Sequence, residues 1–72
     1  MNFVQKRVRV KTAFDGFRVG LKGLCTADLT DENDVFAVYF DEPPIPNNPC
    51  NWISFQPNAR KEHFEVIGEN DE

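Results

Sequence analysis

The sequence predicts an all-β protein that forms one small barrel, closed or nearly closed. The first observation is the spacing of five short runs of mainly β-branched and aromatic residues, with turn-forming residues between them. The second is the length of 72 residues, which is enough for one domain only. The expected strands are residues 6–12, 24–29, 35–40, 51–55 and 64–67.

The first expected strand alternates apolar and basic residues. Because successive side chains of a strand point to opposite faces, Val8 and Val10 are expected to face the core. The outward positions are then Arg7, Arg9 and Lys11. The next segment, 13–23, contains three glycines and predicts a long hairpin-like loop with tight turns, since glycine readily adopts positive φ.

The second and third strands supply much of the expected core. A polar turn at 30–34 separates them, and the inward residues of the second strand are Cys25, Ala27 and Leu29. The third strand is apolar on both faces, and its larger inward residues are Phe36, Val38 and Phe40. This leaves a second apolar face that needs a cover or a partner, formed by Val35, Ala37 and Tyr39.

A proline-rich insert at 41–49 precedes the fourth strand. The alternation places two residues of that strand inward, Ile53 and Phe55. It places two others outward, Trp52 and Ser54. Residues 56–63 are too few for more than a helical turn. The last strand then closes the core through Phe64 and Val66.

The composition is typical of one globular domain, expected at 1–67, followed by a disordered acidic tail at 68–72. Seven phenylalanines, one tryptophan and one tyrosine predict a core of large rings. The chain has no apolar run of about 18–20 residues for a membrane helix and no apolar leader, so we expect a cytoplasmic location. Cytosolic thiols stay reduced, which disfavours the alternative of a disulfide between Cys25 and Cys50.

The net charge of −4 conceals a marked asymmetry. Residues 1–22 contain six basic residues and one acidic residue, whereas residues 23–72 contain two basic and eleven acidic residues. Such a chain can present two opposed surfaces and act as a dipolar docking module. The alternative is ordinary solvated charge on a small protein.

Several short motifs follow one another in a characteristic order. They are a Val-x-Val first strand, a long loop, Lys22-Gly23-Leu24, a third strand ending in Val38-Tyr39-Phe40-Asp41, then Trp52, and a closing strand at 63–67. This order resembles the SH3-like small β-barrel group over about residues 6 to 67. The group includes the small stromal subunit of photosystem I, the ferredoxin-docking subunit of the photosynthetic NDH complex and short phage-encoded proteins.

The resemblance implies a five-stranded SH3-like barrel with a long first loop and a proline-rich insert before the fourth strand. The insert is a departure from the compact members of the group. The resemblance also implies a binding module that docks on a larger assembly, although a fold by itself does not name the partner.

Catalytic, cofactor-binding and metal-binding roles are not expected. The chain has one serine, Ser54, and one histidine, His63, and neither has the sequence context of a nucleophile–base–carboxylate site. A zinc site would combine Cys25, Cys50 and His63, which lack the close Cys pairs of structural zinc. The glycines of 13–23 lack the Gly-Lys-Ser/Thr ending of a phosphate-binding loop.

Single-stranded nucleic acid is one candidate ligand. Bases stack on aromatic rings and phosphates follow cations, and the N-terminal region interleaves both types: Arg7, Arg9, Lys11, Phe14, Phe17, Arg18 and Lys22. The acidic remainder of the chain would repel a polyanion. The sequence pI of about 4.8 also lies far below that of a typical basic binding domain.

A larger protein or protein complex is the favoured partner, with the free chain monomeric. Tyrosine, tryptophan and arginine are enriched among the residues that dominate binding energy at interfaces. The candidate partner-binding residues are Arg7, Arg9, Lys11, Phe14, Phe17, Arg18, Tyr39 and Trp52. Two alternatives stay open: the first loop folds back and buries one of its phenylalanines, or Trp52 packs under the proline insert.

The sequence therefore predicts a non-enzymatic, cytoplasmic module that docks on a larger complex and modulates it. A narrower hypothesis is a phage-encoded regulator of a host machine, such as an inhibitor of bacterial RNA polymerase, acting in the host cytoplasm. The alternatives are a single-stranded nucleic-acid-binding barrel and a permanent accessory subunit of a multiprotein complex.

Overall fold

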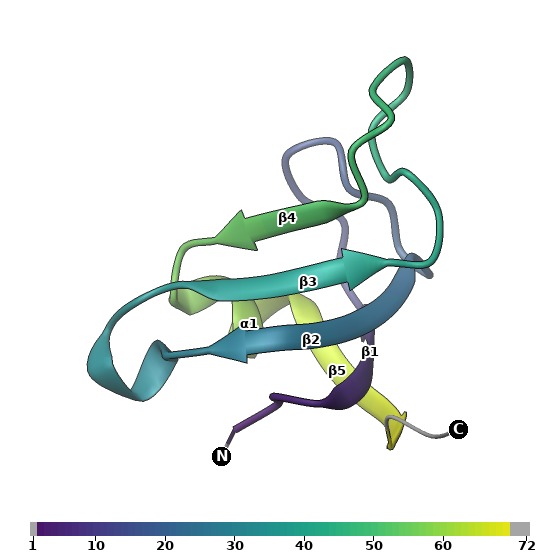
Figure 1. The fold of residues 1–72 in the computed structure, drawn as a ribbon. Helices are drawn as coiled ribbons and strands as arrows, with labels where there is room; N and C mark the ends of the chain where they lie inside the picture. Colours follow the sequence, from purple (N-terminus) through teal and green to yellow (C-terminus); the bar gives the residue numbers. More distant parts are fainter. Residues whose placement is uncertain (1, 70–72) are drawn as a thin grey trace.

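The computed structural model describes residues 2–69 and contains one antiparallel sheet of five strands (Figure 1). In chain order the strands are β1 (Lys6–Val10), β2 (Lys22–Asp28), β3 (Phe36–Phe40), β4 (Trp52–Phe55) and β5 (Phe64–Glu69). In space they follow the order β4-β3-β2-β1-β5. The prediction of a small β fold is confirmed, but the sheet is not closed, because β4 and β5 are its two edges.

Two short helical segments connect the strands. A 3₁₀ turn, η1 (Thr30–Glu32), lies between β2 and β3, and the helix α1 (Asn58–His63) lies between β4 and β5. The helix is slightly longer than the single turn predicted, and it buries Ala59 against the core. Within the described residues, neither segment is long or apolar enough to cross a membrane.

The core lies on one face of the sheet, and its largest side chains are phenylalanine rings. The predicted inward residues Val8 and Val10 are fully buried, as are those of β3. Across the core, the ring of Phe55 on β4 lies 5.2 Å from the ring of Phe64 on β5, measured between centroids. The two edge strands therefore approach each other through side chains, although no backbone ladder joins them in the part of the chain that the structure describes.

Strand β2 departs from strict alternation. Its pairing with β3 shifts register between Cys25 and Ala27, so that Thr26 is an extra residue. Such a bulge moves the following residues to the opposite faces. Cys25 is buried as predicted, but Asp28 is turned inward and Leu29 is 45% exposed. The prediction that Leu29 belongs to the core is wrong for this reason.

The fifth strand also differs from its prediction. Phe64 is buried, but Val66 is 38% exposed and does not close the core. Val66 lies opposite Val8 on β5, an edge strand that has no neighbour on its other side among residues 2–69, so solvent reaches it. The strand continues through Gly68 and Glu69, which had been assigned to the acidic tail. The rest of that expected tail, residues 70–72, lies outside the described residues.

The first loop and the proline insert extend from the same end of the sheet (Figure 1). In the loop, Phe14 and Phe17 exchange two backbone hydrogen bonds around a turn at Asp15 and Gly16. Both turn residues have positive φ, as a type I′ hairpin turn requires, so the predicted tight turn is confirmed. The insert is anchored by its own residues, because Pro44 is fully buried and Ile45 packs against the core.

Candidate binding surface

Strand register brings four residues into one line across the outer face of the sheet. Arg7 on β1 lies opposite Leu24 on β2. Leu24 lies opposite Tyr39 on β3, and Tyr39 lies opposite Trp52 on β4. We call Arg7, Leu24, Tyr39 and Trp52 the outer-face row. Residues opposite each other in antiparallel strands have side chains in contact range, so the row forms one continuous surface.

The two aromatic members of the outer-face row are accessible. Tyr39 is 54% exposed and Trp52 is 50% exposed, which confirms that Trp52 faces outward. The indole Nε1 of Trp52 donates a hydrogen bond of 2.9 Å to Oγ1 of Thr26 on β2. The indole therefore reaches across β3, where the small residue Ala37 is fully buried. This bond holds an exposed ring in a fixed orientation.

The arginines of β1 are already paired within the chain. Arg7 donates to both carboxylate oxygens of Asp41, at 2.8 Å from Nη1 and 2.5 Å from Nη2. The hydrogen bond from Arg7 lowers the pKa of the Asp41 carboxyl below its ordinary value of 3.8. Arg9 donates two hydrogen bonds to Oε2 of Glu65 on β5. The basic strand predicted from the sequence is thus largely compensated by carboxylates of this same chain.

Besides Arg9, four of the predicted binding residues lie outside the outer-face row. Phe17 is 7% exposed and belongs to the core, so the alternative in which the loop folds back and buries a ring is confirmed for Phe17. Phe14 is half-buried and stacks on His63, with ring centroids 4.0 Å apart. The other two are Lys11, just after β1, and Arg18, which pairs with Glu42 of the insert at 3.3 Å.

The two loop rings, Phe14 and Phe17, which were predicted as partner-binding residues, make contacts inside the chain. Phe17 also contacts the rings of Phe40 and Phe55, and Phe14 contacts Phe55 and Phe64. Phe14 thus contacts both edge strands, β4 and β5, whereas Phe17 packs on β3 and β4. In this conformation the loop covers the open side of the core and does not present its rings to a partner.

The single serine and the single histidine of the chain have different neighbours. Ser54 lies on β4 opposite Ala37, whereas the Nδ1 atom of His63 lies 2.9 Å from Oγ1 of Thr12. Between residues 2 and 69, no hydrogen bond joins Ser54 to His63. The same described residues contain no group of three or more His, Cys, Asp or Glu side chains that could hold a metal ion.

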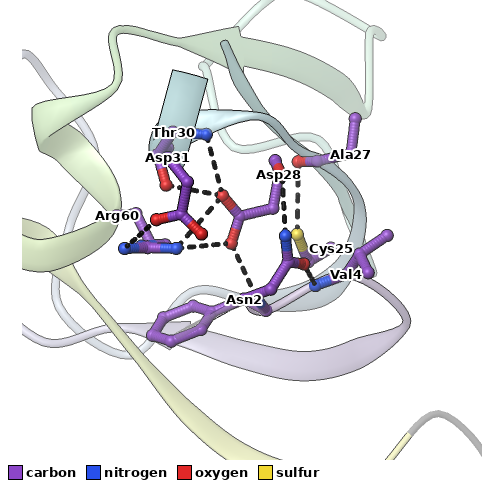
Figure 2. A network of polar contacts seen from close by, with 9 residues as sticks. Asn2, Val4, Cys25, Ala27, Asp28, Thr30, Asp31 and Arg60 are labelled. Carbon is purple, nitrogen blue, oxygen red and sulfur yellow. Dashed lines mark hydrogen bonds and ion pairs between the residues drawn. The ribbon is translucent and has the colours of Figure 1, made fainter. Parts of the chain in front are cut away.

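Sequence reasoning did not anticipate a buried polar network around Asp28 (Figure 2). Its Oδ2 accepts a hydrogen bond of 2.6 Å from the backbone N–H of Phe3. Its Oδ1 accepts bonds from the backbone N–H and the hydroxyl of Thr30. Arg60 of α1 donates to both oxygens, at 3.3 and 3.1 Å, and also pairs with Asp31 at 3.6 Å. No described buried side-chain polar atom lacks a partner.

This network joins three parts of the chain that are far apart in sequence: the N-terminal segment, the β2–η1 junction and α1. Burial acts to raise the pKa of the Asp28 carboxyl, but the hydrogen bonds from Phe3, Thr30 and Arg60 outweigh it and lower the pKa below 3.8. The carboxylate is therefore ionised and fully paired. The only sequence signal was the spacing of Asp28 and Thr30, typical of a local turn.

The two cysteines are free thiols in different environments. Cys25 is buried, and burial together with the nearby charge of Asp28 raises the pKa of its thiol to about 12. Cys50 is exposed, and its Sγ donates to the carbonyl of Trp52 at 3.1 Å. In the structure no disulfide joins Cys25 to Cys50.

The fold and this surface define a class: a small antiparallel β module with an exposed, rigid aromatic row on its outer face. Compared with known proteins, the chain matches no family model, no curated protein and no solved structure.

Proposed function

We propose that this protein is a non-enzymatic binding module that docks on a larger protein or protein complex through the outer-face row and modulates it. The observation that carries the proposal is the pair of Tyr39 and Trp52, which lie directly opposite each other and are both half-exposed. Tyrosine, tryptophan and arginine dominate interface energetics. Because Trp52 is held by Thr26, little rotational freedom remains to be lost on binding.

The charges of the outer face favour a protein over a nucleic acid. A polyanion would need free cations along its path. Arg7 and Arg9 are instead compensated by Asp41 and Glu65. A protein surface can pack against such neutralised pairs at the rim of an apolar contact. Single-stranded nucleic acid stays the second candidate, because exposed rings on a sheet also stack bases.

We also infer that the open sheet is an SH3-like barrel with a gap between β4 and β5. The strand order, the approach of Phe55 to Phe64 and the placement of α1 between the edge strands support this inference. An NMR measurement tests this inference, and we expect nuclear Overhauser contacts between the Phe55 and Phe64 rings. The absence of these contacts in the folded protein would contradict the inference.

The function is tested by affinity capture from a nuclease-treated lysate of the native host. Three baits are compared: the parent chain, the double variant Tyr39→Ala/Trp52→Ala, and Val19→Ala as the matched control. Val19 is 59% exposed and lies in the first loop, outside the outer-face row. We expect a stoichiometric protein with the parent and the control but not with the double variant.

Two outcomes would contradict the proposal. Equal recovery with all three baits would remove the outer-face row from the interface. Loss of every partner after nuclease treatment would favour nucleic acid. The identity of a captured protein also tests the narrower hypothesis of a phage-encoded inhibitor of a host machine such as bacterial RNA polymerase. A partner that stays bound throughout purification would instead indicate an accessory subunit.

A further inference from the structure

A hollow of about 360 Å³ lies between the N-terminal segment, the end of β1 and α1. Its lining residues are Phe3, Lys11, Arg60, Lys61 and Phe64. Three of them are cationic and none is acidic, in a chain whose net charge is −4. We call this the basic hollow. It shares no residue with the outer-face row.

The three cations of the basic hollow differ in their availability. Arg60 is engaged by Asp28 and Asp31. Lys11 and Lys61 are exposed, and within residues 2–69 neither ammonium group belongs to an ion pair. The hollow thus holds two uncompensated positive charges, in contrast to the paired arginines of β1.

The apolar part of the basic hollow is aromatic. The Arg60 guanidinium carbon lies 5.5 Å from the centroid of the Phe3 ring, which orients that ring. The Phe3 ring in turn meets Phe36 edge to face, with centroids 6.1 Å apart. Phe64 forms a buried floor. A flat ring next to free ammonium groups suits a ligand that combines a planar base with an anion.

We propose that the basic hollow binds a mononucleotide. The phosphate lies between the ammonium groups of Lys11 and Lys61, since lysine binds phosphate as a point charge. The base packs against Phe3 above Phe64, because every base has a face that stacks on aromatic side chains. A hollow of this size falls within the range of small-ligand sites.

The proposal is tested by titrating the full 72-residue chain, labelled with ¹⁵N, at low salt. The three probes are AMP, ribose 5-phosphate and adenosine. We expect AMP to shift the amides of Lys11, Lys61 and their neighbours. Ribose 5-phosphate should shift the same amides with at least tenfold weaker affinity. Adenosine should bind more weakly than AMP, because it lacks the phosphate.

Variants separate this site from general charge effects. Lys11→Gln/Lys61→Gln should weaken AMP binding at least tenfold, and Phe3→Leu should weaken AMP more than ribose 5-phosphate. Lys22→Gln is the control, because Lys22 is exposed and does not line the basic hollow. This variant should leave the dissociation constant of AMP unchanged. The ¹⁵N spectrum of each variant shows directly that it is folded.

Three results would overturn the proposal. One is the absence of AMP-induced shifts at the hollow. The second is an equal weakening by Lys22→Gln, which would indicate attraction to charge alone. The third is equal affinity for AMP and ribose 5-phosphate, which would show that the base is not held. None of these results bears on the outer-face row, so the two proposals fail independently.

Discussion

Asp28 is the residue at which the N-terminal segment, the β2–η1 junction and α1 meet. Its buried carboxylate accepts hydrogen bonds from Phe3, Thr30 and Arg60. Removing the charge of a buried, paired group leaves its partners poorly satisfied. The sequence analysis assigned Asp28 neither to the core nor to a candidate site. The bulge at Thr26 turns Asp28 inward, and this bulge has no sequence signature.

We predict that Asp28→Asn lowers the free energy of unfolding by about 2 kcal/mol, since hydrogen bonds to charged groups contribute about 1.5–3 kcal/mol. Urea denaturation at neutral pH measures the change. Asp15→Asn is the matched control, because Asp15 is exposed in a turn with φ of 47°, which asparagine tolerates. Equal effects of the two substitutions would contradict the structural role of Asp28.

The lowered pKa of Asp28 also predicts a pH dependence. Because the folded-state pKa lies below 3.8, the unfolded chain binds the proton first as the pH falls. The stabilisation is therefore complete above about pH 5 and is lost as the pH falls through the folded-state pKa. We expect the free energy of unfolding of the parent to decline more steeply below about pH 5 than that of Asp28→Asn. Parallel pH profiles would contradict the assignment.

The two thiols should differ in reactivity. The thiolate is the reactive form, and burial raises the pKa of the Cys25 thiol to about 12. Cys50 is exposed. We predict that iodoacetamide at pH 8 modifies the folded chain once, at Cys50, and the urea-unfolded chain twice. Mass spectrometry of the intact and digested protein measures this. Modification of both thiols at equal rates in the folded chain would show that Cys25 is accessible.

At the scale of elements, the close contact between β2 and β3 depends on Gly23. A Cβ atom at this position would lie 2.5 Å from the carbonyl oxygen of Tyr39 and 2.8 Å from Cα of Phe40. Both neighbours are backbone atoms of the adjacent strand, so they cannot move aside without disturbing the sheet.

We predict that Gly23→Ala lowers the free energy of unfolding by about 3 kcal/mol, at the upper end of overpacking costs. Gly16→Ala is the comparison, because Gly16 has φ of 89° but open space around it. Its cost should be nearer about 1 kcal/mol, from backbone strain alone. Thermal and urea denaturation of both variants show which substitution lowers the free energy of unfolding more. A larger effect for Gly16→Ala would contradict the close strand packing.

The sequence was sufficient to predict the elements whose faces follow a simple period. Strand β3 and the inward residues of β1 and β4 are placed correctly, because successive side chains of a regular strand point to opposite faces. The second half of β2 and the end of β5 are placed wrongly. The bulge in β2 and the edge position of β5 both depend on the neighbouring strands. Local pattern cannot indicate which strand lies beside which.

The outer-face row was also predictable only in part. The outward positions of Tyr39 and Trp52 follow from alternation within each strand. Their alignment with Leu24 and Arg7 depends on register across four strands, which only the fold supplies. The sequence left open whether the loop rings fold back, because it does not show that the open side between β4 and β5 needs a cover.

At the scale of the whole molecule, half of the six basic side chains of residues 1–22 are compensated by folding. The N-terminal arginines pair with carboxylates from later in the chain, Arg7 with Asp41, Arg9 with Glu65 and Arg18 with Glu42. The basic first strand expected from the sequence therefore has its two outward arginines, Arg7 and Arg9, neutralised on the outer face. Its exposed rings are the feature that distinguishes that face.

A consequence is weak salt dependence of partner binding. We predict that the affinity for the captured protein changes less than tenfold between 50 and 200 mM salt, whereas a contact to six or more phosphates would lose about a thousandfold. Isothermal titration at several salt concentrations measures the slope. A steep slope would indicate that the partner is held by charge and would favour nucleic acid.

The most direct measurement uses the single tryptophan of the chain as a reporter. The protein is labelled with 5-fluorotryptophan, and the ¹⁹F signal of Trp52 is followed as the captured partner is added. If the outer-face row is the docking surface, the signal shifts and loses its sensitivity to solvent D₂O at one equivalent of partner. An unchanged Trp52 signal while the partner is bound would show that docking occurs elsewhere on the molecule.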